Sequence, residues 1–182
     1  MTVDANTGLS LASKVAIVTG AGQGLGRDIA LAMARAGARV AVVDLNPETA
    51  QKVAAERGGY GKAGIAIPCD VSRREEVRAA VERTVSEWGG IDLLVDNAHN
   101  LGAVQARCMD TDDEHLLRHL NSGLFGTYYF LQESYEYLKA RGAGSSTSVR
   151  ARVSPDARST SLGDPRASGS TPSAPPPTTP PP

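Results

Sequence analysis

The chain has 182 residues, which is long enough for one domain with a substantial hydrophobic core. A formal net charge of −1, with 41% hydrophobic and 21% charged residues, argues against nucleic-acid and anionic-membrane partners. Cys69 and Cys108 are too few and too far apart for a disulfide framework or a zinc cluster. The sequence has no recognisable signal peptide and no apolar run of membrane-spanning length, so we predict a cytoplasmic protein.

Short apolar runs alternate with amphipathic helical patterns along the first 142 residues. This alternation indicates βαβ units and a parallel sheet. Right-handed crossovers give the strand order 3-2-1-4, so we predict a Rossmann-type, doubly wound α/β fold that is truncated after about four strands. The predicted strands are 15–18, 39–43, 63–68 and 91–95, and the predicted helices are 25–34, 47–57, 72–88 and 111–139.

Two local signals mark helix ends. Gly37 is expected to end the first helix. Ser72-Arg73-Arg74-Glu75 is a capping-box pattern, which predicts that Ser72 caps the third helix.

The composition changes at Gly142. Nine of the eleven prolines follow it, with only three larger aliphatic residues. Such a segment cannot bury enough apolar surface to offset its ordering entropy. We therefore predict an N-terminal extension (1–12), a dinucleotide-binding domain (13–142) and a disordered tail rich in Pro, Ser, Thr and Arg (143–182).

A glycine-rich loop, residues 20–26, lies between the first predicted strand and helix. A pyrophosphate must approach the backbone N–H groups of a helix N-terminus, where a Cβ would block it. Gly20 would allow the tight turn, Gly24 the close approach, and Gly26 the packing of helix on strand. The loop candidates for cofactor binding are therefore Gly20, Gln23, Gly24, Leu25 and Gly26. The alternative is a plain glycine-rich turn.

Asp44 ends the second predicted strand, 24 residues after Gly20. A carboxylate there would accept hydrogen bonds from the ribose hydroxyls and would repel a 2′-phosphate. Gln23 offers no compensating cation, although Arg27 is nearby, so NAD is favoured over NADP. Leu45 follows Asp44 and joins the candidates. The alternative is a solvated acid that starts a turn.

Four motifs resemble the short-chain dehydrogenase/reductase family. Thr19–Gly26 resembles its TGxxxGxG loop, and Asp44 resembles the acid of its NAD-preferring members. Cys69-Asp70-Val71 is similar to the aspartate–valine pair that contacts adenine. Leu94-Val95-Asp96-Asn97-Ala98 is similar to the NNAG motif. These motifs add Asp70, Val71, Asn97 and Ala98 to the cofactor candidates. From the residues alone, Asp70 could instead be a loop acid favoured by a helix dipole.

The resemblance covers about residues 13–142. It implies hydride transfer between a nicotinamide and an alcohol or carbonyl carbon of a small-molecule substrate, and it implies a homo-oligomer. Asp96 and His99 depart from it, because the family has Asn and Gly there. His99 would either crowd the nicotinamide ribose or be tolerated.

The catalytic residues are largely missing. Asn121 resembles the family's Asn that organises the proton relay, although Asn121-Ser122-Gly123 offers several alignments and a polar residue at a helix kink is the alternative. The family's Ser and Tyr-x-x-x-Lys belong beyond a fifth strand. Tyr135 and Lys139 have the spacing but precede any such strand. We interpret the surrounding residues as a packing face: Tyr128, Tyr129, Leu131, Tyr135 and Leu138.

His115 and His119 share a predicted helix face. With no third ligand evident, we expect a solvated pair and no metal site.

Residues 146–153 suggest a reading-frame change. Read one base out of frame, they can spell V-(N/D)-V-S-S-x-A-G, the strand and serine that the family would have here. We hypothesise a frameshift near Gly144; the alternative is a natural disordered tail with a P-x-x-P element at Pro172–Pro175.

Three functions follow from these alternatives. They are an NAD(P)-dependent alcohol/carbonyl oxidoreductase encoded by the intact gene, a non-catalytic nucleotide-binding remnant, and an interaction protein that uses the proline-rich tail. Because the family's Ser and Tyr-x-x-x-Lys are missing, we expect the chain as written to be inactive. A half sheet would leave strand 91–95 as an open apolar edge, so we also expect it to be marginally stable or aggregation-prone.

Overall fold

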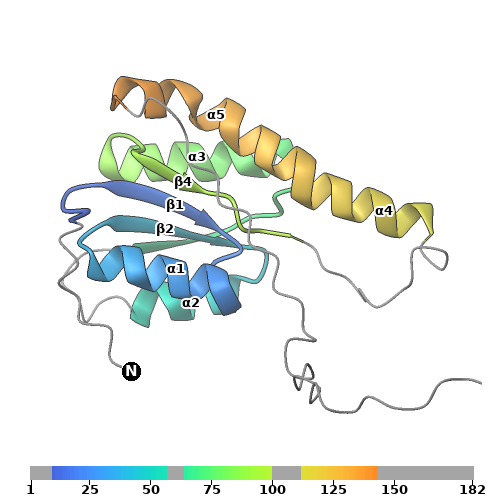
Figure 1. Ribbon diagram of the computed structural model, residues 1–182, viewed down its shortest axis with the longest axis horizontal. Helices are drawn as coiled ribbons and strands as arrows, with labels where there is room; N and C mark the ends of the chain where they lie inside the picture. Colours follow the sequence, from blue (N-terminus) through green and yellow to red (C-terminus); the bar gives the residue numbers. More distant parts are fainter. Residues whose placement is uncertain (1–9, 57–63, 100–111, 143–182) are drawn as a thin grey trace, which may run out of the picture. The chain divides into compact units, whose positions relative to one another are not determined.

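The computed structural model describes residues 10–56, 64–99 and 112–142 (Figure 1). The predictions for Cys108 and for the tail lie outside these ranges. In chain order the elements are β1 (Val15–Thr19), α1 (Gly24–Arg35), β2 (Arg39–Asp44), α2 (Pro47–Glu56), β3 (Gly64–Pro68), α3 (Arg74–Trp88), β4 (Leu93–Val95), α4 (Asp113–His119), the π-helical segment η3 (Leu120–Phe125) and α5 (Gly126–Ala140).

The four strands form one parallel sheet in the order β3-β2-β1-β4, as predicted. Every residue of β1 is buried, which explains why its sequence is a continuous apolar run rather than an alternating one. β4 spans three residues, fewer than predicted. Just before it, Asp92 accepts the Val15 N–H (2.9 Å) and pairs with Lys14 (3.0 Å), which ties the starts of β1 and β4 together.

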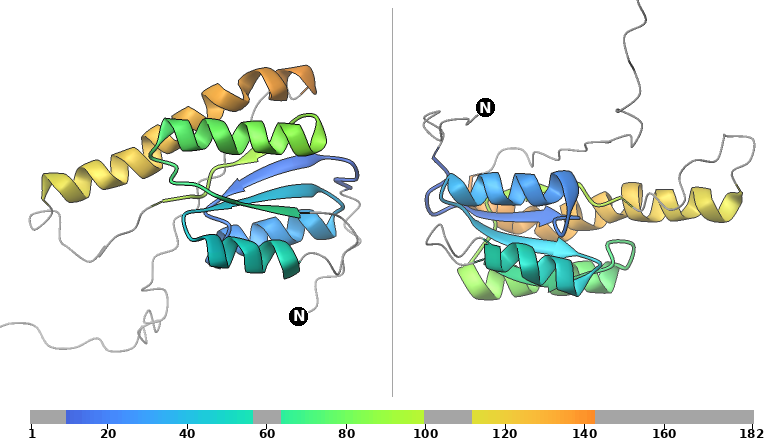
Figure 2. Two further views of the ribbon diagram at one scale, coloured as in Figure 1. Left: turned by 180° about the vertical axis from the view of Figure 1, so that it is seen from behind. Right: turned by 90° about the horizontal axis from the view of Figure 1, so that it is seen from below.

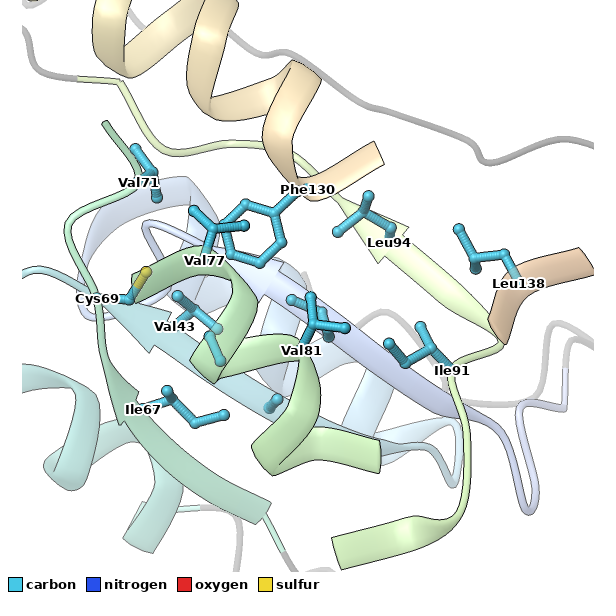
Figure 3. Close-up of a cluster of buried hydrophobic side chains, with 13 residues drawn as sticks. Val43, Ile67, Cys69, Val71, Val77, Val81, Ile91, Leu94, Phe130 and Leu138 are labelled. Atoms are coloured by element: carbon cyan, nitrogen blue, oxygen red, sulfur yellow. The ribbon is translucent and has the colours of Figure 1, made fainter. Parts of the chain in front are cut away.

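Helices cover both faces of this sheet. Figures 1 and 2 show α1 and α2 on one face and α3 and α5 on the other. Alternate strand residues supply the two cores, because successive side chains of a strand point to opposite faces. Ala16 and Val18 pack toward α1 and α2, and Ile17 packs toward α3 and α5. Figure 3 shows the second core, with Phe130 of α5 among the side chains of α3 and the strands.

Gly37 ends α1 as predicted: its φ is +99°, and its N–H donates to Ala34 O. The predicted capping box at the start of α3 is wrong. α3 begins at Arg74, and its N-cap residue makes no side-chain cap. The Ser72 hydroxyl instead donates to Asp70 Oδ1 (2.7 Å), and Glu76, not Glu75, accepts the Asp70 N–H (2.8 Å). Ser72 thus bonds to Asp70 instead of capping the helix, which starts later than the pattern indicates.

The predicted C-terminal helix is one helical stretch with a π-turn in its middle. Asp112 caps α4 by accepting the His115 N–H (2.7 Å). Within η3, the Gly126 N–H donates to Asn121 O, five residues back, which is the π-helical pattern. Figure 1 shows α4 extending beyond the carboxyl ends of the strands, and no residue of α4 is buried.

The packing face of α5 differs from the predicted one. Tyr128 and Tyr135 are 50% and 58% exposed. The buried residues are spaced four apart: Gly126, Phe130, Ser134 and Leu138. Tyr129 and Leu131 are only partly buried, so of the predicted face only Leu138 lies fully in the core. Among the described residues, no helix is long and apolar enough to cross a membrane.

Candidate functional site

The carboxyl ends of the four strands meet at one edge of the sheet. Thr19 of β1 lies beside Val43 of β2, Asp44 lies beside Pro68 of β3, and Val18 lies beside Val95 of β4. The candidates that follow each strand are therefore brought to this edge. They are the loop 20–26, Asp44 and Leu45, Asp70 and Val71, and Asn97 and Ala98.

The glycine loop is fastened to β2. The Ala21 N–H donates to Val43 O (3.0 Å), and the Gly22 N–H donates to Asp44 Oδ2 (2.8 Å). A Cβ on Gly22 would lie 2.3 Å from Thr49 Oγ1 and 2.8 Å from Asp44 Cγ. Gly22, which the sequence reasoning did not single out, therefore allows the loop to hold the Asp44 carboxylate. The only sign of this role in the sequence is that Gly22 is a glycine at one of the variable positions of the TGxxxGxG motif.

A second set of hydrogen bonds fastens the loop to the segment after β4. Asn97 Nδ2 donates to Thr19 O (3.0 Å) and Gly20 O (3.1 Å). The buried Thr19 hydroxyl accepts the N–H groups of Asn97 (2.9 Å) and Ala98 (3.0 Å). The structure thus gives Asn97 the role of a brace between the ends of β1 and β4. Sequence reasoning missed the part that Thr19 plays in it.

The start of α1 combines close packing with an open space. A Cβ on Gly26 would lie 2.1 Å from Gly20 O and 2.5 Å from Asn97 Nδ2, so glycine allows α1 to pack on the end of β1, as predicted. Gly24 has φ +53° and nothing within 4 Å of a Cβ position. Gln23 makes no side-chain cap and the first turn holds no acid. The start of α1 thus has no side-chain cap, no acid in its first turn and open space at the Gly24 Cβ position, a combination that suits an anion.

The Asp44 carboxylate has a donor on each oxygen. Besides Gly22 N–H on Oδ2, Oδ1 accepts the Asn46 N–H (3.0 Å). Leu45, beside it, is 67% exposed. Arg27, the nearby cation, forms ion pairs with Glu56 (2.5 Å) and Asp28 (3.3 Å). Its guanidinium is therefore engaged on α1 and α2.

The third strand end is built differently. Asp70 Oδ1 accepts hydrogen bonds from the backbone and hydroxyl of Ser72. The Val71 side chain is buried in the core that includes Phe130, where it contacts Gly126 closely, so only its backbone is available at the edge. Burial raises the pKa of the Cys69 thiol to about 12, so it stays protonated at neutral pH.

The histidines are not arranged as expected. His119 Nδ1 lies 3.1 Å from His99 Nε2, whereas His115 Nδ1 lies 3.0 Å from Asp112 Oδ1 and 3.3 Å from Arg118 Nη2. The two rings therefore have different partners, and both residues are partly buried rather than fully solvated. Asp96 is buried. In the described ranges no three His, Cys, Asp or Glu side chains form a metal-binding group.

The residues considered for catalysis all lie in the C-terminal helical stretch: Asn121 in η3, and Tyr135 and Lys139 in α5. Asn121 is exposed in η3, where its backbone carbonyl accepts the π-type hydrogen bond from Gly126. Tyr135 is exposed, with Lys139 Nζ 5.8 Å from its ring centroid. Tyr135 and Lys139 thus form a cation–π contact at the surface of α5.

Known proteins share this architecture. The profile of the short chain dehydrogenase family matches residues 14–154. The short-chain dehydrogenase/reductase astE of Aspergillus oryzae is 38% identical over 138 residues, which cover 75% of this chain and 52% of that protein. A crystal structure of a short-chain type dehydrogenase/reductase from Mycobacterium marinum has a TM-score of 0.71 at 32% identity, covering 78% of this chain and 56% of that one.

A structure of 7α-hydroxysteroid dehydrogenase complexed with NADH and 7-oxo glycochenodeoxycholic acid is similar as well. Its TM-score is 0.70 at 30% identity, and the match covers 78% of this chain and 54% of that one. The chain spans about half the length of the relatives it matches. Proteins of this family bind NAD(P). Since the profile matches most of the sequence and the fold agrees with it, the chain belongs to the short-chain dehydrogenase family.

Proposed function

We propose that this chain binds NAD at the carboxyl edge of the sheet, as the nucleotide-binding portion of an oxidoreductase for small alcohols or carbonyl compounds. The observation that carries the proposal is the open space at Gly24, next to the uncapped N-terminus of α1. A pyrophosphate would bind there to backbone N–H groups, in a loop already fixed by Asp44 and Asn97. Bound NAD would supply a hydride acceptor.

The remaining candidates would hold the other parts of the dinucleotide. Gln23 and Leu25 belong to the pyrophosphate loop, and Asp44 would accept the adenosine ribose hydroxyls. Leu45, Asp70 and the backbone of Val71 would border the adenine. Ala98 and the Asn97 backbone would lie toward the nicotinamide ribose.

We further propose that NAD is preferred over NADP. The Asp44 carboxylate would repel a 2′-phosphate. The ion pair of Arg27 with Glu56 supports this preference, because the guanidinium considered as a partner for that phosphate is already paired.

Catalysis is a separate matter. We expect no dehydrogenase turnover from the chain as written, because the family's Ser and Tyr-x-x-x-Lys are not recognisable in it. Under the frameshift hypothesis the intact gene encodes the complete enzyme. Resequencing from the codon of Lys139 to beyond Pro182 tests this. A single-base correction that restores V-(N/D)-V-S-S and Tyr-x-x-x-Lys supports a complete oxidoreductase, whereas an unchanged sequence leaves nucleotide binding alone. Deleting residues 143–182 and looking for lost partners tests the interaction alternative.

Nucleotide binding is tested by calorimetry with two matched variants of the full chain. Gly24→Ala and Gly142→Ala both place a methyl group on a glycine with positive φ (+53° and +71°) and nothing within 4 Å. The backbone strain is therefore similar, but only the first methyl fills the proposed phosphate space. We expect Gly24→Ala to weaken NAD binding at least about tenfold, and Gly142→Ala to leave it unchanged. Equal affinities in both variants, or no NAD binding by the wild type, would contradict the proposal.

The cofactor preference has its own control. Asp44→Asn and Asp70→Asn each remove one negative charge at the same edge. The wild type should have a higher dissociation constant for NADP than for NAD. We expect Asp44→Asn to reduce this ratio and Asp70→Asn to leave it unchanged. A wild type that prefers NADP, or an identical change in both variants, would show that Asp44 does not set the preference.

A further inference from the structure

Two imidazole rings join the segment after β4 to the end of α4. His99 Nε2 and His119 Nδ1 are 3.1 Å apart, and the ring centroids are 5.0 Å apart with planes inclined by 34°. Both side chains are partly buried. The two residues are separated by 20 positions in the sequence, so the tertiary fold brings them together.

We propose that His99 and His119 form a binding site for a divalent transition-metal ion, with nickel or copper as the preferred class. Imidazole nitrogens bind such ions at about 2.0–2.1 Å, and two bonds of this length ending on nitrogens 3.1 Å apart meet at about 100°. That angle is near the roughly 90° between neighbouring ligands in the tetragonal sites of Ni²⁺ and Cu²⁺. Because the two nitrogens face each other across a hydrogen bond, each ring must rotate to direct its lone pair at a common ion.

The proton balance is simple. In the metal-free pair, one ring donates its N–H to the lone pair of the other. On binding, the donor ring takes its other tautomer, with the proton on its second nitrogen, so that both facing nitrogens offer lone pairs. Water completes the coordination, because the described residues supply no third ligand at this pair.

His115 is excluded as a partner by its surroundings. Its Nδ1 contacts Asp112 and lies 3.3 Å from the Arg118 guanidinium, whose charge opposes a nearby cation. It therefore provides a control on the same helix.

Metal binding would also join two positions that are 20 residues apart in the sequence. An ion that binds the native state stabilises it by mass action. We expect the thermal midpoint to rise with added metal. This inference does not depend on NAD binding.

The test uses the full chain, purified without a histidine tag, and titrates nickel chloride by calorimetry. We expect one ion per chain. His99→Gln and His119→Asn each place an amide near the lost nitrogen and can keep a hydrogen bond, but we expect them to weaken binding more than about tenfold, because one of two protein ligands is gone. His115→Asn should bind nickel as the wild type does. Of the three variants, it alone should keep the rise in thermal midpoint that nickel causes in the wild type.

A measurement on the wild type covers the case in which a variant fails to fold. The Cu²⁺ electron paramagnetic resonance spectrum should contain hyperfine coupling to nitrogens of two imidazoles. Absence of nickel binding, an equal loss in His115→Asn, or copper coordinated by fewer than two imidazoles would overturn the proposal.

Discussion

The glycine loop (residues 20–26) and the helical stretch α4–η3–α5 are held in different ways. The loop is fixed by hydrogen bonds to Asp44, Thr19 and Asn97 and by contacts too close for a Cβ. The helical stretch depends on large buried side chains at one end only. Its other end carries exposed apolar residues: Leu116, Leu117, Leu120, Leu124 and Phe125. The nucleotide loop is thus structurally complete within the described residues, whereas the helical stretch has apolar surface that they leave uncovered.

The anchored end of the helical stretch should give the largest effect. Phe130 is fully buried and Tyr128, two residues earlier, is 50% exposed. We expect Phe130→Ala to lower the free energy of unfolding by about 3–5 kcal/mol, because it leaves a large cavity. Tyr128→Ala should change it by no more than about 0.5 kcal/mol. Urea denaturation measures both, and similar losses would mean that α5 is not anchored through Phe130.

Close packing in the loop should give the next largest effect. A Cβ on Gly26 meets Gly20 O at 2.1 Å, and we expect Gly26→Ala to destabilise the protein by about 1–3 kcal/mol. The sign of the change is decisive. Where space allows, alanine in place of glycine stabilises a helix by about 0.5–1 kcal/mol. A raised urea midpoint would therefore show that the loop is more loosely packed than the structure indicates.

The link between α5 and α3 should be weaker and pH-dependent. Hydrogen bonds from Arg78 and then Arg74 hold the pKa of Glu133 below its ordinary value of 4.5. Its contribution is therefore complete well above pH 4.5 and is lost as the pH falls through the lower folded-state pKa. We expect Glu133→Gln to cost at most about 1 kcal/mol at pH 7, since the side chains of Arg74 and Arg78 are 41% and 54% exposed and water screens the ion pairs.

The cost of Glu133→Gln should shrink toward pH 3. Glu136→Gln, on an exposed position of the same helix, controls for the loss of charge. A cost that stays constant with pH would argue against the ion pairs as its source.

The uncovered end should show the smallest change in stability. Leu117 and Leu124 are 54% and 56% exposed, so we expect the double substitution to Gln to shift the free energy of unfolding by no more than about 0.5 kcal/mol per site. Self-association should fall, because exposed apolar patches promote it. Light scattering over a range of protein concentrations measures this. Unchanged scattering would mean that aggregation, where it occurs, starts elsewhere.

Local signals explain what the sequence could predict. Buried strands read as apolar runs and the glycine loop has a fixed spacing, so the sheet order and the grouping of Asp44, Asp70 and Asn97 at one edge followed from them. The His99–His119 contact could not be predicted, because it depends on a tertiary contact between distant segments. The roles of Gly22 and Ser72 also depend on neighbouring backbone that a pattern does not contain.

The π-turn in η3 limits how helical spacing can be counted across it. A continuous α-helix advances about 100° per residue, and a π-turn adds residues without adding the same rotation. If residues 120–125 formed regular α-helix with no residue removed, α4 would therefore be turned about its axis relative to α5 by about 100°. His119 would face away from His99 while Phe130 kept its place. The π-turn thus sets which face of α4 meets His99, without changing the face that α5 buries.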